Sequence, residues 1–309
     1  MSRITVGVNK LVAENNFKSG FVALVGRPNV GKSTLVNRLV GQKVAIMSDK
    51  PQTTRHKIHS VLNRDDAQVV FLDTPGIHKP RHRLGERMVD LALGALKEVD
   101  LVLFLTVAGE PGTGDKYIID QFQGISTPVI LVLNKIDLVS RGDILPIIES
   151  FRHLYSFNEI IPVSALTGDN IDRLTEVVMG YLSEGPRYYP EGMITDQPER
   201  FIMSEIIREK VLQLTSQEIP HSVSVDVEEI QQRPNNVVAI RAVIYTERDS
   251  QKGILIGRSG GMLKEVGKRA REEMEALFGS RVFLELWVKV KSDWRNNEKY
   301  LKNFGYLSE

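Results

Sequence analysis

The fold is decided by one stretch, Gly26-Arg27-Pro28-Asn29-Val30-Gly31-Lys32-Ser33, which Thr34 follows. It comes directly after the apolar run 21–25, which favours a buried strand, and it opens the segment 33–40, which has helical spacing. A glycine-containing turn between a strand and a helix, with Lys and Ser at its end, is the phosphate-binding P-loop pattern. Its backbone N–H groups can surround a phosphate chain, and the helix N-terminus favours negative charge. The sequence therefore predicts a P-loop that binds a nucleotide.

Short apolar runs alternate with segments of helical spacing along the first 185 residues. The runs that favour buried strands are 21–25, 69–72, 101–105, 129–133 and 160–163. The segments with helical spacing are 33–40, 84–96, 115–122, 144–151 and 171–182. Such alternation predicts an α/β fold with a doubly wound, mainly parallel sheet. Ligands of such sheets bind beyond the carboxyl ends of the strands, where the motifs described below also fall.

The P-loop pattern assigns roles in phosphate and metal binding to its last residues. Lys32 is expected to reach the β- and γ-phosphates, and the Ser33 hydroxyl to ligate Mg²⁺. The run 69–72 is followed by Asp73-Thr74-Pro75-Gly76. Its carboxylate suits a water-mediated Mg²⁺ contact, and the N–H of Gly76 can approach the γ-phosphate. Asp-x-Pro-Gly alone is also a common turn, but the P-loop upstream favours the nucleotide-binding interpretation.

A candidate base-reading element follows the apolar run 129–133, namely Asn134-Lys135-Ile136-Asp137. The Asp137 carboxylate can accept hydrogen bonds from both the N1–H and the exocyclic amine of guanine. Adenine lacks this donor pair and would leave a buried charge unpaired, so we expect strong discrimination. We expect Lys135 to lie along the base, Asn134 to tie this loop to the P-loop, and Ser164-Ala165-Leu166 to offer a backbone N–H to the guanine O6. An ATP-dependent kinase or ATPase would have no use for Asp137.

The pattern changes at the linker Gly185-Pro186-Arg187-Tyr188-Tyr189-Pro190. Beyond it the sequence predicts a helix at about 200–214, strands at 222–228 and 237–246, a helical region from about 253 to 278 interrupted at 257–260, and a last strand at 281–291. This order indicates a second, α+β unit. The expected division is an N-terminal extension 1–19, a nucleotide-binding domain 20–184, a linker 185–199 and a second domain 200–309.

The turn Gly257-Arg258-Ser259-Gly260 separates the two helical segments of this second unit. After residue 186 the chain carries 19 basic and 19 acidic residues, but the stretch 248–271 holds seven Lys or Arg against two acids. A Gly-x-x-Gly turn lets a sugar–phosphate backbone approach the main chain, and flanking cations such as Lys264 and Lys268 hold its phosphates. The apolar residues expected to wall a groove for bases are Ile254, Leu255 and Ile256. In an ordinary helix–helix turn they would be core residues.

The helix-strand-strand-helix-helix-strand order resembles a type II KH domain, an RNA-binding fold. The four nucleotide-binding elements, in their order, resemble the translation-factor class of GTPases. Further segments resemble the Era family of bacterial ribosome-assembly GTPases: Pro51-Gln52-Thr53-Thr54-Arg55, the linker, Thr195-Asp196-Gln197-Pro198, Ile206-Ile207-Arg208-Glu209-Lys210 and Ile219-Pro220-His221-Ser222. The resemblance covers residues 20–305 and leaves the N-terminal residues outside it.

The resemblance implies a GTP-hydrolysing switch that binds small-subunit ribosomal RNA near its 3′ end and assists maturation of the small subunit. It implies a Mg²⁺-ligating threonine at Thr53 or Thr54, of which we favour Thr54. The expected catalytic residues are Lys32, Thr54, Gly76 and Asn29. Asn29 is expected either to hold a K⁺ ion or only to stabilise a turn. Many small GTPases carry a water-orienting Gln where this chain has Ile77, so hydrolysis should need assistance.

A second interpretation makes the chain an RNA-binding assembly module in which GTP or GDP is a structural ligand that turns over slowly. Within either interpretation, the tail 289–302, with Trp294 and Tyr300, either adds RNA contacts or forms a solvated amphipathic helix.

The composition bounds the remaining expectations. Hydrophobic residues make up 42% and charged residues 26%, as in globular proteins, and the absence of cysteine excludes disulfides and Cys-based metal sites. No stretch approaches the roughly 20 apolar residues of a membrane span, and the polar N-terminus is unlike a signal peptide. A net charge of +1 means that RNA binding has to come from a local patch. We expect a cytoplasmic monomer, with peripheral association at the inner face of the cell membrane left open.

Overall fold

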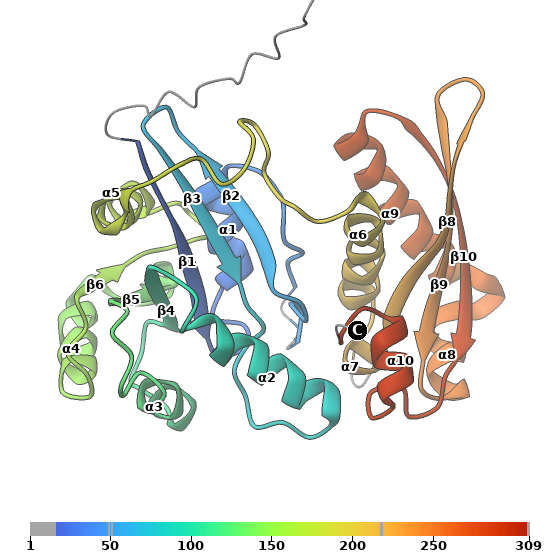
Figure 1. Ribbon diagram of the computed structural model, residues 1–309. Helices are drawn as coiled ribbons and strands as arrows, with labels where there is room; N and C mark the ends of the chain where they lie inside the picture. The colour runs from blue at the N-terminus through green and yellow to red at the C-terminus, as the bar shows by residue number, and fades with distance from the viewer. Residues whose placement is uncertain (1–16, 49, 51, 217–218, 308–309) are drawn as a thin grey trace, which may run out of the picture.

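Two units with separate sheets make up the protein, and the computed structural model describes residues 17–48, 50, 52–216 and 219–307 (Figure 1). In the first unit the strands are β1 Lys18–Gly26, β2 Ile58–Asn63, β3 Ala67–Asp73, β4 Leu101–Val107, β5 Val129–Asn134, β6 Glu159–Pro162 and β7 Ser183–Glu184. The helices are α1 Lys32–Val40, α2 Arg83–Ala95, α3 Thr113–Asp120, α4 Arg141–Arg152 and α5 Ile171–Tyr181, with a 3₁₀ turn at Ile136–Leu138.

The first sheet has the strand order β2-β3-β1-β4-β5-β6 and is mainly parallel, which confirms the predicted fold class. β2 was not predicted. It pairs antiparallel with β3, and its outer edge is covered by the linker, where Ser60 bridges to Thr195 and Val61 N donates to Ile194 O. β1 begins at Lys18, inside the expected extension 1–19, because its first residues pair with β3 and with β7.

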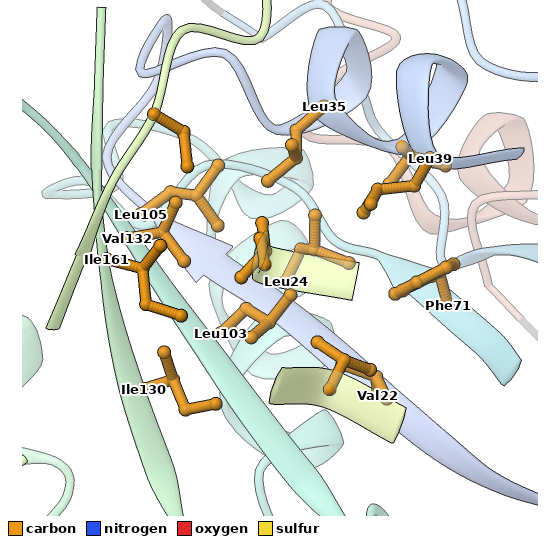
Figure 2. Close-up of a cluster of buried hydrophobic side chains, with 14 of the residues drawn as sticks. Val22, Leu24, Leu35, Leu39, Phe71, Leu103, Leu105, Ile130, Val132 and Ile161 are labelled. Atoms are coloured by element: carbon orange, nitrogen blue, oxygen red, sulfur yellow. The ribbon is translucent and has the colours of Figure 1, made fainter. Parts of the chain in front are cut away.

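Helices cover both faces of this sheet, which explains why its strands are apolar nearly throughout. Helices α1 and α5 cover one face. Figure 2 shows Leu35 and Leu39 of α1 packed with Leu24 of β1 and Leu103 of β4. Helices α2, α3 and α4 cover the other face through a second buried cluster. The loops at the carboxyl ends of β1, β3 and β5, which carry the expected motifs, therefore stand on a rigid base.

The second unit has the predicted helix-strand-strand-helix-helix-strand order with two short helices added. Its elements are α6 Glu199–Leu214, α7 Ile219–Ser222, β8 Ser224–Arg233, β9 Val237–Thr246, α8 Asp249–Ile256, a 3₁₀ turn Arg258–Gly260, α9 Gly261–Phe278, β10 Arg281–Val290 and α10 Glu298–Asn303. The sheet order is β10-β9-β8, with β8 antiparallel and β10 parallel to β9. One core cluster joins α6, α8 and α9 to this sheet.

Helix α6 stands between the two sheets (Figure 1). Four of its charged residues are buried, namely Glu205, Arg208, Glu209 and Lys210. Glu205 and Arg208 pair with each other through two bonds of 2.6 and 2.7 Å. Glu209 is 1% exposed and accepts from Lys43 Nζ at 2.6 Å and from Met47 N at 2.8 Å, both in the first unit. The second unit therefore holds the segment that follows α1.

A separate apolar cluster also joins the two units. Its buried members are Leu84 and Met88 of α2 together with Trp294, Leu301 and Tyr306 near the C-terminus. Within the described ranges of the chain, no helix combines the length and the apolar character needed to cross a membrane.

Candidate nucleotide site and KH groove

The P-loop connects β1 to α1 and lies directly against two other loops. Gly31 has a φ of 100°, and a Cβ atom there would lie 2.3 Å from Asn134 Nδ2. A Cβ atom at Gly76 would lie 2.7 Å from Pro28 Cα. Both positions therefore require glycine, because a side chain would push apart loops that have to meet around the ligand.

Lys32 is buried, and its amino group points at the main chain of the P-loop. Nζ donates to Gly26 O at 3.2 Å and to Arg27 O at 3.1 Å. Burial lowers the pKa of Lys32 to about 8, and the charge of Asp73 opposes that shift. A phosphate bound in the loop would favour the charged form and replace these carbonyl contacts.

Three oxygen-bearing side chains from separate elements meet beside Lys32. Ser33 Oγ donates to Asp73 Oδ2 at 2.7 Å and lies 2.9 Å from Thr54 Oγ1, which is 3.3 Å from the same carboxylate oxygen. Thr53 is not part of this group, since its hydroxyl donates to Lys50 O at 2.6 Å. The structure thus brings together the three expected metal ligands and distinguishes Thr54 from Thr53.

The donor set fits Mg²⁺. Two hydroxyls and a carboxylate are oxygen ligands, which this ion prefers. Asp73 Oδ1 is buried, and no described residue hydrogen-bonds to it. Burial raises the pKa of Asp73, against the opposing effects of Lys32, Ser33 and Thr54. A cation at this point would compensate a carboxylate that its surroundings leave only partly satisfied.

The candidate guanine-reading loop is tied to the P-loop as expected. Asn134 Nδ2 donates to Val30 O at 2.8 Å, and its Oδ1 accepts from Ala165 N at 2.9 Å. Lys135 Nζ donates to Asn29 O at 2.9 Å. One amide side chain therefore joins three loops, which fixes the spacing between the phosphate and base ends of the site.

The Asp137 carboxylate is exposed, and Ser164 holds one of its oxygens. The Ser164 hydroxyl donates to Asp137 Oδ1 at 2.5 Å. The backbone N–H groups of Ser164 and Ala165 are both bonded within the protein, to Asp169 O and Asn134 Oδ1. The expected donor to guanine O6 is therefore restricted to Leu166 within the Ser164-Ala165-Leu166 segment.

Several of these groups line one cleft of about 590 Å³. Its walls contain the expected residues Pro28, Asn29, Gly31, Lys32, Ser33, Thr34, Thr54, Gly76, Lys135 and Leu166, and also Ile46, Met47, Ser48, Gln52 and Thr53. Other expected residues have supporting positions outside the wall. Arg27 Nε pairs with Asp115 at 2.8 Å, the Thr74 hydroxyl donates to Leu24 O at 2.6 Å, and Val30 is buried.

A groove of similar volume, about 590 Å³, lies between α9 and β10 of the second unit. Its apolar wall includes Leu263, Leu284 and Leu286, and the cations on α9 are Lys264, Lys268 and Arg271. These cations recur at helical spacing, so they share one face of α9. Gly260 lies at the end of the groove, where the Gly257–Gly260 turn has positive φ at Gly257, Ser259 and Gly260.

Several residues expected at this groove lie elsewhere. Leu255 is fully buried in the core, which contradicts its expected place in the wall. Ile254 is half exposed and Ile256 packs beside the core, but neither lines the groove. Trp294 is fully buried and donates from Nε1 to Ser222 O at 2.9 Å, so it has no surface to offer to RNA. The wall of this groove comes from α9 and β10 instead, and nothing in the sequence distinguishes its leucines from core residues.

Fold and site together define a P-loop GTPase joined to a KH domain. The family model for the 50S ribosome-binding GTPase matches residues 21–135, and a KH-domain model matches residues 218–295. Two solved structures are similar over nearly the whole chain. One is a tyrosine-to-alanine variant of Era from Aquifex aeolicus bound to GDP.AlF4⁻, and the other is Era in complex with MgGDPNP and nucleotides 1506–1542 of 16S ribosomal RNA.

Each of these structures is 44% identical to this chain and superimposes with a TM-score of 0.92. The alignment covers 94% of this chain and 100% of the other in both cases. The chain therefore belongs to the Era family of GTPases.

Proposed function

We propose that this chain is a switch that hydrolyses GTP with Mg²⁺ and binds small-subunit ribosomal RNA near its 3′ end in the assembling small subunit. The observation that carries the proposal is the meeting of Ser33, Thr54 and Asp73 within 3.3 Å beside the P-loop. The Era structures hold GDP.AlF4⁻ in one case and MgGDPNP with 16S ribosomal RNA in the other. Their identity to this chain supports extending both kinds of ligand to it.

The residues at the cleft have distinct roles in hydrolysis. Lys32 binds the β- and γ-phosphates, and the N–H of Gly76 donates to the γ-phosphate. Ser33, Thr54 and Asp73 would hold Mg²⁺, which when bound would supply positive charge next to the phosphates. We assign Asn29, which lines the cleft, to a K⁺ ion at the same phosphates.

The groove between α9 and β10 is the proposed RNA site. Bases of a single strand lie against Leu263, Leu284 and Leu286, while Lys264, Lys268 and Arg271 hold phosphates. The strand passes the Gly257-Arg258-Ser259-Gly260 turn at its backbone. Of the residues expected in the wall, exposed Ile254 remains only as a contact beside this turn. Ile256, which directly precedes the turn, packs against the core.

Contacts to the second unit hold Thr54 on both sides, and they supply a route between the two ligands. Arg208 of α6 donates to Thr53 O. Arg55 is 1% exposed and donates to Val223 O at 2.6 Å, just before β8. A shift of Thr54 after loss of the γ-phosphate would therefore move groups on which the KH fold is built.

Single-turnover hydrolysis by the full chain tests the proposal. The reaction is run with an RNA of the 16S 3′ end, with a scrambled RNA, and without RNA. We expect a requirement for Mg²⁺, faster hydrolysis with the 3′-end RNA, and faster hydrolysis in K⁺ than in Na⁺. RNA binding without hydrolysis in any condition would favour the alternative, a slowly turned-over structural nucleotide. Equal rates in K⁺ and Na⁺ would remove only the role given to Asn29.

The remaining expectations extend the same proposal. We place the nucleotide-binding domain at 20–184, the linker at 185–199 and the KH domain at 200–309. The separate sheets of the two units support a division into two domains, while β1 begins at Lys18 and α6 at Glu199, just before the proposed bounds. A cytoplasmic monomer and peripheral contact with the membrane stay predictions.

A further inference from the structure

The side chain that follows Gly76 cannot take part in hydrolysis. Ile77 is 2% exposed and belongs to the buried cluster under α2 and α3, and its N–H donates to Gly26 O at 3.0 Å. Many GTPases place at this position a Gln that orients the attacking water. A different group has to align the water here if the protein contributes to that alignment.

Gln52 lines the nucleotide cleft, two residues before Thr54. Its Nε2 lies 3.1 Å from His78 Nε2, and His78 Nδ1 lies 2.9 Å from Gly76 O. A carbonyl oxygen can only accept, so Nδ1 of His78 carries the hydrogen and donates it. Nε2 is then the acceptor and receives its hydrogen bond from the Gln52 amide.

This chain of hydrogen bonds determines the direction of the Gln52 amide. Because its NH₂ group is used on His78, its carbonyl oxygen Oε1 is the end left for another partner. Oε1 is buried, and none of the residues described by the structure hydrogen-bonds to it. Gln52 also has a φ of 61°, a conformation that costs a non-glycine residue on the order of 1 kcal/mol. A strained backbone and an unpaired buried acceptor, both next to a reaction site, point to a function.

We propose that Gln52 is a catalytic residue of GTP hydrolysis. Its Oε1 accepts a hydrogen bond from the attacking water and so takes the role of the Gln that many GTPases have at the position of Ile77. The inference rests on the proposed nucleotide site. The water oxygen forms a bond to the γ-phosphorus while the bond from that phosphorus to the β–γ bridging oxygen breaks. GDP leaves, and both water hydrogens end on the phosphate product as H₂PO₄⁻. Gln52 orients the water and takes no proton.

His78 has a different role in this arrangement. Both of its ring nitrogens are used, one on Gly76 O and one on Gln52, so it acts through Gln52 as a positioning residue. The loop of Gly76, which donates to the γ-phosphate, thereby determines where Gln52 Oε1 lies. The water-orienting group and the phosphate-binding group become parts of one hydrogen-bonded unit.

The test uses Gln52→Met, which keeps the size of the side chain and removes the acceptor, with Gln123→Met at an exposed site as the matched control. We expect Gln52→Met to lower kcat by roughly tenfold to a hundredfold with KM unchanged. Its affinity for GDP should stay at the wild-type value, while its affinity for GDP with aluminium fluoride, which mimics the transition state, should fall in parallel with kcat.

His78→Phe should reproduce part of this loss, and the double variant should be no slower than Gln52→Met alone. Additive losses would contradict the positioning role of His78. Wild-type kcat and wild-type affinity for GDP with aluminium fluoride in Gln52→Met would overturn the proposal, as would an equal loss of plain GDP binding, which indicates a structural role. Failure of the wild-type chain to bind or hydrolyse GTP would instead refute the proposed nucleotide site.

Discussion

The nucleotide cleft and the KH groove have nearly the same volume, about 590 Å³ each, but they are built in opposite ways. The polar groups at the cleft and directly behind it, such as Lys32, Asp73 and Asn134, are buried, and each is hydrogen-bonded within the protein. The cations of the groove, such as Lys264 and Lys268, are exposed beside an apolar wall. Removing a group from the cleft leaves a buried partner unsatisfied, whereas water replaces a group removed from the groove. Single substitutions should therefore have large effects in the first site and small ones in the second.

The largest expected effect is at the base end of the cleft. Asp137→Asn turns one acceptor toward guanine into a donor, so one hydrogen bond to the base becomes a clash of two donors. GTP affinity should fall by roughly 10³-fold to 10⁴-fold, and XTP should become the preferred nucleotide because xanthine presents an oxygen where guanine has its amine. Competition binding of GTP and XTP measures the shift.

Asp143→Asn is the matched control, because Asp143 is exposed on α4 and bonds only to Ser140 at 2.6 Å among the contacts of the described chain. It should leave both affinities unchanged. Retained preference for GTP in Asp137→Asn would show that the base does not lie at this loop, and the contrast between the two sites would then lose its main support.

The second prediction concerns the interface between the two sites. Burial favours the neutral form of Glu205, but the Arg208 guanidinium outweighs it and holds the pKa of Glu205 below its ordinary value. Arg208→Ala would leave this carboxylate buried without its partner and remove the donor to Thr53 O. We expect the free energy of unfolding to fall by about 3 kcal/mol and RNA to lose its effect on hydrolysis. Urea unfolding and the RNA-stimulated rate measure the two outcomes.

An exposed pair on α9 provides the control for stability. Arg269 Nε lies 2.7 Å from Glu265, but both side chains are nearly half exposed, so Arg269→Ala should cost much less stability than Arg208→Ala. Equal losses in the two variants would mean that burial does not set the energy of these pairs. If RNA still stimulated hydrolysis fully in Arg208→Ala, the hydrogen bond from Arg208 to Thr53 O would not be part of the route between the two sites.

The two sites also differ in how far the sequence predicts them. Ser33, Asp73 and Asp137 lie at or soon after the carboxyl ends of parallel strands of one sheet, and such strand ends meet at the same edge. Their convergence can therefore be predicted from short motifs. The wall of the groove cannot, because Leu263, Leu284 and Leu286 look like ordinary core residues until α9 packs beside β10.

Helix phase and long-range contacts account for the other differences between the predicted and the observed structure. α8 has only eight residues, so its pattern could not show that Leu255 faces the core while Ile254 faces solvent. Strand β2 was missed because its pairing with β3 and the linker, rather than its apolar content, makes it a strand. The role proposed for Gln52 depends on His78, which lies 26 residues away in the chain.

The third prediction concerns how stability depends on pH at the interface between the two units. Burial, together with the charges of Arg208 and Arg55 and against that of Glu205, lowers the pKa of His56 to about 4. Its ring packs between Phe201 and Tyr306. The unfolded chain binds the proton at about pH 6.5 and the folded one only near pH 4, so stability is fully present above pH 6.5 and is lost as the pH falls through this window.

As the pH falls from 6.5 to 5, protonation of His56 in the unfolded chain should lower the free energy of unfolding by on the order of 2 kcal/mol. Urea titration at several pH values measures this change. His82 should add to the same trend, because burial and the charge of Arg295 lower its pKa to about 4 as well. Its Nδ1 accepts from Gly85 N at 2.9 Å, a bond that protonation breaks. In His56→Phe the pH dependence should become shallower, and an unchanged slope would contradict the assignment to His56.

The smallest expected effect is at the groove. Lys264→Ala or Lys268→Ala should weaken binding of the 16S 3′-end RNA by roughly threefold to tenfold and lower the salt slope of log affinity by about one. Hydrolysis without RNA should not change. Fluorescence anisotropy between about 50 and 200 mM salt measures both values, with Lys116→Ala on α3 as the exposed control.

Each lysine is exposed and Arg271 lies on the same face, so neighbours and water compensate for a single loss. If one substitution abolished RNA binding at every salt concentration, the groove would depend on a single preorganised contact, as the cleft does, and the difference between the two sites would lie in their ligands rather than in their construction.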